Sequence, residues 1–260
     1  MSNLTNPFSL HGKVILLTGG SGLYGRQLTR AIAEAGATLV IASRNADKLE
    51  AVAKEHRDNG LDVRCETFDQ SDEASIIALR DRLLSQYGKV DGLVNNSVTR
   101  TMKTCADPLE AWEKSMKVNA TGVFLMLRTF DEAMAKQGDG SIVNIGSIQG
   151  MVGPSPEFYA GTDMGLPAPD YFFHKGGMIN LTRYFASILG KDNVRVNCVS
   201  AGGFSNNQPE PFLSRYCAHT MLGRMADDED LGGVIVFLLS RAAKYVTAAN
   251  LAVDGGYTAK

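Results

Sequence analysis

Glycines cluster between the first apolar run of the chain and the first helical pattern, in Thr18-Gly-Gly-Ser-Gly-Leu-Tyr-Gly25. Glycine lets the backbone turn sharply and approach a bound group closely, and a helix N-terminus presents unpaired N–H groups and a positive dipole end. In an α/β protein, this turn is where the pyrophosphate of a dinucleotide rests. The turn therefore predicts a dinucleotide site, with a tight strand–helix turn that binds nothing as the alternative.

Two further segments carry side chains suited to the adenosine half of such a ligand. The second apolar run ends in Ser43-Arg44, where a carboxylate would accept from a ribose 2′-hydroxyl and a guanidinium would instead pair with a 2′-phosphate. Arg44 therefore favours NADP over NAD, with a solvated surface arginine as the alternative. Asp69 follows the third run, where it is suited to accept from the adenine amino group or to serve only as a turn carboxylate.

The composition excludes several other classes of protein. Lys and Arg number 26 and Asp and Glu 28, so a formal net charge of -2 gives no basic excess of the kind that nucleic-acid binders carry. The four cysteines lie far apart and form no zinc spacing, so we expect free thiols, no metal and a reducing cytoplasm. No apolar run approaches the roughly 18 residues of a spanning helix. The start, Met1–Leu10, lacks the pattern of a signal peptide.

Short apolar runs alternate with helical patterns along the chain, and these elements must position the candidate residues. We expect strands over 13–18, 38–43, 62–68, 90–95, 141–145, 195–199 and 251–254, and helices over 26–35, 46–59, 71–87 (capped by Ser71), 107–136, 171–189 and 228–240. Such alternation predicts an α/β fold: one Rossmann-type, doubly wound parallel sheet over 1–260, with right-handed crossovers and helices on both faces. The proline-dense segment 150–169 is expected to form a long loop.

With these elements in place, the chain resembles the short-chain dehydrogenase/reductase family in its short, single-domain form. The resemblance runs from Lys13 to Tyr257. It rests on an ordered set of motifs: the glycine turn, Asp69, Asn95-Asn96, Trp112 with Val118-Asn119, Gly146-Ser147, Tyr171-Phe-Phe-His-Lys175, Val196-Asn197 and Val253-Asp-Gly-Gly256. A lone Tyr-x-x-x-Lys is common by chance, whereas the ordered set is specific. A weaker likeness, through 176–182 and 201–210, is to bacterial oxidoreductases of surface-sugar and nonulosonic-acid biosynthesis.

The resemblance implies a catalytic group of Asn119, Ser147, Tyr171 and Lys175. In that family the tyrosine donates a proton to a ketone while a nicotinamide supplies hydride. The lysine, one helical turn further on, would stabilise the phenolate, the serine would hydrogen-bond the substrate oxygen, and the asparagine would hold a water that links the lysine to solvent. The implied cofactor contacts are Gly19, Ser21, Gly22, Leu23, Tyr24, Gly25, Ser43, Arg44, Asp69, Gln70, Asn96, Ser97, Tyr171, Lys175 and Phe204.

The interval between the candidate serine and tyrosine departs from the family pattern. Tyr171 follows Ser147 by 24 residues, which is longer than usual, and the excess falls in 153–170. Tyr159 lies nearer the usual distance, but Asp163 rather than a cation stands four residues after it, so Tyr171 remains the candidate.

We expect this insertion to form part of the substrate wall. It contains Glu157, Asp163 and Asp170 and no Lys or Arg, so its surface would disfavour anionic substrates. Arg100, Lys103 and Arg215 are the cations that could offset this charge from other segments. Elsewhere, Leu23 and Val98 stand where the family has glycine, and Ala201 stands where it has proline.

The sequence thus predicts an NAD(P)-dependent oxidoreductase that interconverts a secondary alcohol and a ketone. A sugar or other polyhydroxylated substrate is favoured because Ser205–Gln208 offers amide and hydroxyl groups. One alternative is a reductase of an apolar ketone (lipid, steroid or aromatic), since residues such as Phe158 and Met164 could line an apolar pocket. Another is a dinucleotide-binding sensor without catalysis, prompted by Ser97-Val98. The resemblance also implies a cytoplasmic homo-oligomer, a dimer or a tetramer, with no nucleic-acid or membrane partner.

Overall fold

A seven-stranded sheet forms the centre of the part of the chain that the computed structural model describes, residues 6–260. The expectation that Met1–Leu10 lacks the pattern of a signal peptide therefore concerns a segment of which residues 1–5 lie outside the described part. All neighbouring strands are parallel, in the order β3-β2-β1-β4-β5-β6-β7. The strands are β1 (Val14–Thr18), β2 (Thr38–Ser43), β3 (Val63–Thr67), β4 (Gly92–Asn95), β5 (Gly140–Ile145), β6 (Val194–Ala201) and β7 (Asn250–Val253). The predicted Rossmann-type sheet is confirmed.

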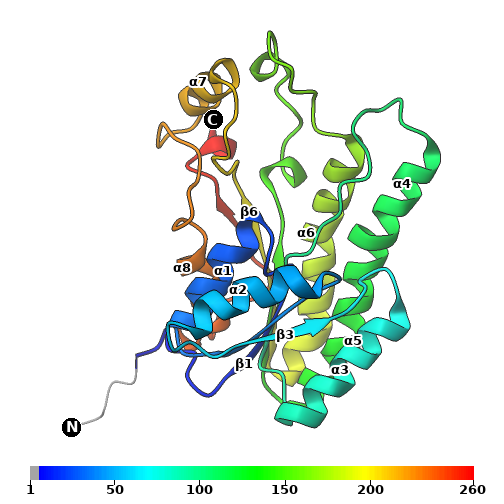
Figure 1. Cartoon of the computed structure of the whole chain (residues 1–260), viewed down its shortest axis with the longest axis vertical. Helices are drawn as coiled ribbons and strands as arrows, with labels where there is room; N and C mark the ends of the chain where they lie inside the picture. The colour runs from blue at the N-terminus through cyan, green and yellow to red at the C-terminus, as the bar shows by residue number, and fades with distance from the viewer. Residues whose placement is uncertain (1–5) are drawn as a thin grey trace.

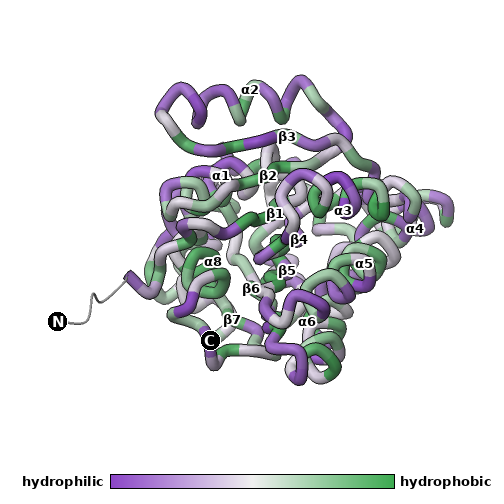
Figure 2. The backbone as a smooth tube through the Cα atoms, turned by 90° about the horizontal axis from the view of Figure 1, so that it is seen from below, coloured by the Kyte–Doolittle hydropathy of each residue, from purple (hydrophilic) through white to green (hydrophobic). Residues whose placement is uncertain are grey.

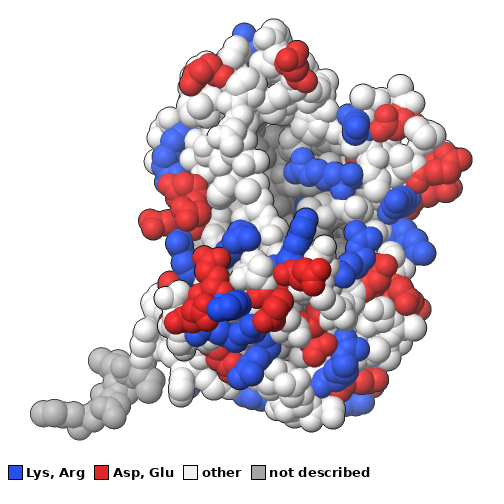
Figure 3. All heavy atoms as spheres, in the orientation of Figure 1, with Lys and Arg blue, Asp and Glu red and all other residues white. Residues whose placement is uncertain are grey.

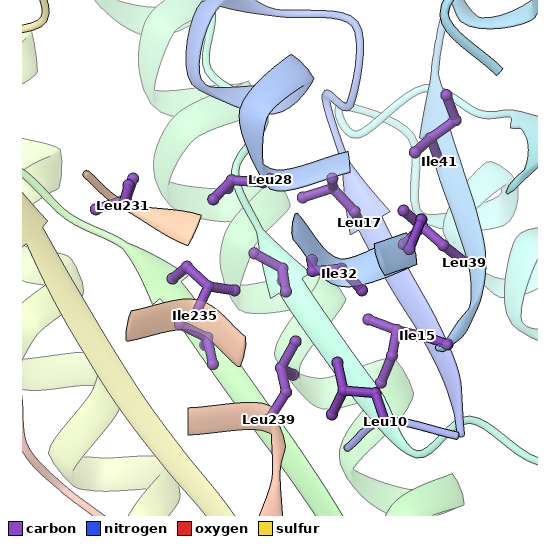
Figure 4. Close-up of a cluster of buried hydrophobic side chains, with 14 of the residues drawn as sticks. Leu10, Ile15, Leu17, Leu28, Ile32, Leu39, Ile41, Leu231, Ile235 and Leu239 are labelled. Carbon is purple, nitrogen blue, oxygen red and sulfur yellow. The ribbon is translucent and has the colours of Figure 1, made fainter. Parts of the chain in front are cut away.

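Successive side chains of each strand point to opposite faces of the sheet, and helices cover both faces. On β1, Ile15 and Leu17 join one buried cluster and Leu16 joins the other. The first cluster packs against α1 (Leu23–Glu34), α2 (Ala46–Arg57) and α8 (Gly232–Leu239), as Figure 4 shows for part of it. The second packs against α3 (Glu73–Tyr87), α5 (Gly122–Gln137) and α6 (Pro169–Leu189). Figure 2 shows the strands in series between these two layers of helices.

Several helices begin at residues other than those predicted. Helix α1 starts at Leu23, three residues early, so Gly25 lies in its first turn rather than before it. A Cβ on Gly25 would lie 2.0 Å from the carbonyl oxygen of Gly19, which means that this glycine serves close packing and does not break the helix. Helix α6 starts at Pro169, because proline fits the first position of a helix.

The start of α3 corrects a second boundary. Its cap is Asp72, whose side chain accepts from the Ala74 N–H, and not Ser71 as predicted. Ser71 lies in the turn before the cap, where its N–H and its hydroxyl both donate to Asp69. One helix, α7 (Glu210–His219), was not predicted at all.

The long helical stretch after β4 is interrupted by a π-helical turn. Helix α4 (Leu109–Met116) leads into the turn Lys117–Thr121, and α5 follows without a loop. Such turns widen a helix locally and are frequent at functional sites. This one contains Asn119, a candidate catalytic residue.

The strand order reverses between β1 and β4, so the segments that follow these two strands diverge. Figure 1 shows α7 and the loop after β5 standing beyond the carboxyl ends of the strands, on the same side of the molecule. Within residues 6–260, no helix combines the length and apolar character needed to cross a bilayer. No group of three or more His, Cys, Asp or Glu side chains in that range is arranged to hold a metal ion.

Candidate active site

A cavity of about 1250 Å³ opens at the carboxyl ends of the strands. Open α/β sheets bind ligands at this edge, where the strand order reverses. Its hollow is visible in the face shown in Figure 3. Of the residues predicted for catalysis or cofactor binding, all except Asn119 are among the described residues that line the cavity: Gly19, Ser21, Gly22, Leu23, Tyr24, Gly25, Ser43, Arg44, Asp69, Gln70, Asn96, Ser97, Ser147, Tyr171, Lys175 and Phe204.

The glycine turn forms one wall of this cavity. Gly19 has a left-handed φ of 69°, a conformation that favours glycine. Its N–H donates to the Ala42 carbonyl, which ties the turn to β2. Helix α1 then begins at Leu23, so the unpaired N–H groups of its first turn lie at the cavity. The Leu23 side chain is 50% exposed and stands out of the turn, which explains why leucine is tolerated where glycine was expected.

Tyr24 joins the glycine turn to the loop after β6. Its hydroxyl donates to the Gly202 carbonyl oxygen over 2.6 Å, and its ring packs edge-on against Phe204. Burial is the main cause that raises the pKa of Tyr24 above its usual value. The Tyr24 hydroxyl is therefore already bound within the protein. A cofactor can contact Tyr24 only through its other atoms at the cavity wall.

The other end of the cavity is suited to an adenosine group. Arg44 and Lys48 line it after β2. Asp69 accepts from the backbone N–H and hydroxyl of Ser71 at 2.8 Å each, and the first of these bonds is the largest cause that lowers the pKa of Asp69. Asp69 is thus a turn carboxylate that also lines the cavity. Gln70 also lines the cavity, and its Oε1 is buried with no hydrogen-bond partner among residues 6–260.

The candidate proton donor and its cation lie on one helix. Tyr171 and Lys175 are one turn apart on α6, and the lysine Nζ is 5.7 Å from the centroid of the tyrosine ring. Lys175 is only 3% exposed, and its ammonium donates to the carbonyl oxygen of Ile145 at the end of β5. Burial lowers the pKa of Lys175, while the Tyr171 phenol acts in the opposite direction. The Ile145 carbonyl therefore holds the Lys175 ammonium near the ring of Tyr171.

Ser147 reaches the same place from β5. It caps a short turn, Ile148–Gly150, by accepting from the Gln149 N–H over 3.2 Å. This bond leaves the serine O–H free to donate into the cavity. A Cβ on Gly150 would lie 2.6 Å from the carbonyl carbon of Lys175. Only glycine at position 150 therefore lets this turn pack against α6, and that packing brings the serine and the lysine to one wall.

Tyr159 does not share this environment. Its ring packs against Phe212 at 5.1 Å, and burial, followed by the neighbouring Tyr257, raises its pKa to about 12. It lines the cavity from the insertion and not from α6. Among residues 6–260 the tyrosine with a lysine one helical turn further along α6 is Tyr171, which agrees with the choice made from the sequence.

Asn119 is buried behind the cavity and its side chain is fully used. Its Oδ1 accepts from the Thr99 N–H, and its Nδ2 donates to the Thr99 carbonyl and to Ser115 Oγ, at 2.8 to 3.0 Å. These bonds fix the loop after β4 to the π-helical turn. The expected role of holding a water can fall only to the main-chain carbonyl of Asn119.

Asp170, which the sequence placed among the acids of the insertion, completes this network through a contact that was not predicted. Ser115 Oγ donates to Asp170, which is 3% exposed, lines the cavity and immediately precedes Tyr171. Hydrogen bonds thus run from Thr99 through Asn119 and Ser115 to the first turn of α6. The signal in the sequence was a serine four residues before Asn119, on the same helical face, and an acid in a helix first turn, where the dipole favours it.

His174 packs behind the tyrosine. Its ring is edge-on to Tyr171, with centroids 5.2 Å apart, and neither nitrogen has a partner among the described residues. Burial, then the charges of Lys175 and Arg100, lower the pKa of His174 to about 3. The imidazole is therefore neutral near pH 7 and supports the tyrosine by packing.

The insertion does line the cavity, but two of the acids expected on its surface do not. Glu157 and Asp163 are absent from the lining residues that the structure describes, and Tyr159, Met164, Gly165, Leu166, Pro167 and Ala168 line the cavity instead. Arg215 is also not a source of charge for the cavity, because it donates to the carbonyl oxygens of Glu157, Phe158 and Ala160. The insertion is thereby anchored to α7, with its apolar side toward the substrate.

Comparison with known proteins agrees with this geometry. The family model described as enoyl-(acyl carrier protein) reductase matches residues 22–258. A cis-4-hydroxycyclohexanecarboxylate dehydrogenase of Sinomonas cyclohexanicum is 34% identical over 254 residues, which cover 95% of this chain and 97% of that protein. The chain belongs to the short-chain dehydrogenase/reductase family. It is an NAD(P)-dependent oxidoreductase that acts on CH–OH groups.

Solved members of this family share the whole fold. A gluconate 5-dehydrogenase from Burkholderia cenocepacia, in complex with NADP and tartrate, superposes with a TM-score of 0.88 at 29% identity and covers 98% of both chains. A xylitol dehydrogenase bound to NAD⁺ gives a TM-score of 0.86 at 26% identity, covering 95% of this chain and 99% of that one. The cofactor of this short-chain dehydrogenase/reductase is accordingly a nicotinamide dinucleotide.

Proposed function

We propose that the enzyme interconverts a secondary alcohol and a ketone on a polyhydroxylated small molecule, such as a sugar, a polyol or a sugar acid. The observation that carries the proposal is the convergence of Tyr171, Lys175 and Ser147 on one wall of the cavity. Solved relatives named for gluconate and xylitol support a substrate of this class.

Each of these residues has a distinct part in the proposed reaction. When bound, the nicotinamide dinucleotide supplies or accepts the hydride. In the direction of reduction, the Tyr171 hydroxyl donates its proton to the substrate oxygen, and the same proton returns to the phenolate in oxidation. Ser147 hydrogen-bonds that oxygen as charge develops on it. The buried Lys175 ammonium, whose Nζ lies 5.7 Å from the centroid of the Tyr171 ring, stabilises the phenolate.

NADP is the preferred cofactor in this proposal. Arg44 and Lys48 line the cavity where β2 ends, which is the place of the adenosine ribose in this fold. The carboxylate near them, Asp69, is bound by Ser71. A guanidinium and an ammonium suit a 2′-phosphate.

Polar groups at the substrate end support a hydroxylated substrate. Gln149 lines the cavity beside Ser147, and Asn206 and Gln208 line it from the loop before α7. The Gln208 amide is already engaged, since it donates to the Phe204 carbonyl and accepts from the Asn206 N–H. Gln149 and Asn206 are therefore the amides that we assign to substrate hydroxyls.

An apolar ketone is the second candidate. Met164, Leu166 and Phe212 line the same cavity and offer an apolar surface of the kind that a steroid or an aromatic ring requires. A panel followed by NADPH absorbance separates the two. We expect turnover with gluconate, galactitol or xylitol, and turnover confined to steroid or aromatic ketones would overturn the proposal.

We also propose a cytoplasmic homo-oligomer without nucleic-acid or membrane partners. All four cysteines are free thiols, which suits a reducing compartment. Phe173, Tyr184 and Ile188 are exposed on α6, with Phe124 on α5, and exposed large apolar side chains of this kind suit contact with a second copy. Light scattering tests this, and a monomer at micromolar concentration would contradict it.

A further inference from the structure

Two cations follow β4, and one of them lies near an acid. The Asp107 carboxylate accepts from the Lys103 backbone N–H over 2.5 Å; this bond is the main cause that lowers the pKa of Asp107, and the Lys103 charge contributes. Arg100 and Lys103 are both exposed and line the cavity. Neither forms an ion pair with any residue in 6–260, whereas Arg224 binds Asp230 and Arg82 binds Glu66. The contact that the structure gives the Arg100 guanidinium is the ring of Tyr171, 4.9 Å away. The Arg100 charge is therefore available to a ligand, whereas the Lys103 charge is shared with Asp107.

The other cations of the cavity already have a use. Arg44 and Lys48 lie at the adenosine end, and the Lys175 ammonium is bound to the Ile145 carbonyl. The acid at the substrate end is Asp170, which is buried and bound by Ser115. Figure 3 shows Lys and Arg atoms along the walls of the hollow. The substrate end thus carries the Arg100 guanidinium, which has no acidic partner among residues 6–260, and the Lys103 ammonium, which forms no side-chain ion pair there.

The position of the guanidinium suits a carboxylate. A guanidinium that lies over an aromatic ring keeps its N–H edges free, and these edges match the two oxygens of a carboxylate. Tyr171 is the proposed proton donor, so an anion on Arg100 lies close to the reacting carbon. One small molecule can fill both places.

We propose that Arg100, with Lys103 beside it, binds a carboxylate of the substrate, so that the enzyme acts on hydroxy and oxo acids in preference to neutral polyols. This rests on the proposed function, because it takes Tyr171 as the residue next to the reacting carbon. A carboxylate site is also compatible with the apolar inner side of the insertion. The rest of a carboxylic acid substrate can be either hydroxylated or apolar.

A matched pair of substrates tests the proposal. Gluconate and glucitol have the same carbon chain and differ in one terminal carboxylate. We expect Arg100→Gln to raise KM for gluconate about tenfold to a hundredfold, with KM for glucitol, kcat and the affinity for NADP changed less than about twofold. Lys103→Gln should act in the same direction by a smaller factor. Lys244, exposed and absent from the cavity lining, gives the control variant Lys244→Gln.

Three results would overturn the assignment. If KM for gluconate is unchanged in Arg100→Gln, the carboxylate does not bind there. If kcat falls equally for both substrates, Arg100 acts on the Tyr171 phenol and not on the substrate. A loss of NADP affinity equal to the loss for gluconate would assign Arg100 to the cofactor instead.

A binding measurement keeps the inference separate from catalysis. Tyr171→Phe enzyme loaded with NADP⁺ is titrated with gluconate and with glucitol in a calorimeter. Binding of gluconate that is lost in the double variant with Arg100→Gln supports the anion site, even if the proposed reaction fails. Equal affinity for gluconate and glucitol, or no binding of gluconate at all, contradicts the anion site.

Discussion

The hydroxyl of Ser115 donates a hydrogen bond to the carboxylate of Asp170, the residue immediately before Tyr171. Both residues are buried, and Ser115 also accepts from Asn119. The start of α6 is thereby tied to the π-helical turn and, through Thr99, to the loop that contains Arg100. The segments that surround the candidate proton donor are held as one unit.

Removing this hydrogen bond should destabilise the protein. Ser115→Ala leaves a buried carboxylate without its donor, which costs about 1–3 kcal/mol of the free energy of unfolding. We expect Tm to fall by several degrees in thermal denaturation. Asp170→Asn keeps an acceptor for Ser115 and should lose less. A Ser115→Ala protein with unchanged Tm would show that the bond contributes nothing to stability.

His174 should make the protein more sensitive to acid. Its pKa is lowered to about 3 in the folded state, from an ordinary value of 6.5. Between those two pH values the unfolded chain binds the proton and the folded chain does not, so stability falls as pH drops from about 6.5 toward 3. Urea unfolding of wild type and His174→Phe across this range measures the effect. The variant should show a smaller loss, and equal pH profiles would contradict the shift.

Arg44 should decide the choice of cofactor. Arg44→Ala removes the guanidinium that we assign to the 2′-phosphate, so the Kd for NADP should rise about tenfold to a hundredfold. The Kd for NAD should change little, because NAD has no such phosphate. Fluorescence titration with both reduced cofactors is the measurement. Equal losses for the two would remove the basis for NADP preference.

Gly25 provides a test of the phosphate turn, and Gly233 on α8 provides the comparison. In Gly25→Ala the new methyl group would lie 2.0 Å from the Gly19 carbonyl oxygen, so the turn must distort and cofactor binding should be lost. Gly233 is a helical glycine with open space around it, and Gly233→Ala should stabilise the protein by roughly 0.5–1 kcal/mol. Normal cofactor affinity in Gly25→Ala would show that the turn is not built as described.

Most of the fold was predictable because its signals are local. Each central strand is a short buried apolar run, as in Val14–Thr18, and alternation with helices implies a parallel sheet. Helix α7 lacked such a signal, since Phe212 and Tyr216 pack into a small separate cluster with Phe158 and Tyr257. Its place depends on residues far apart in the chain.

The site was predictable by position but not in its contacts. The ordered motifs located Tyr171 and Lys175, which share one helix. The bond between Ser115 and Asp170 joins residues 55 positions apart, so the local signals of each residue do not show that the two side chains meet. The same holds for Arg215, whose bonds to the insertion make it structural, and for Glu157 and Asp163, which are absent from the cavity lining that the structure describes.

The central claim is that Tyr171 is the proton donor, and two tyrosine variants test it most directly. Tyr171→Phe and Tyr159→Phe each remove one hydroxyl from the cavity, but only Tyr171 has Lys175 beneath its ring. With a substrate that wild type reduces, we expect kcat of Tyr171→Phe to fall by a factor of about 10²–10⁴ while NADPH binding persists. Tyr159→Phe should keep kcat within about an order of magnitude. Turnover that survives in Tyr171→Phe and is lost in Tyr159→Phe would contradict the account.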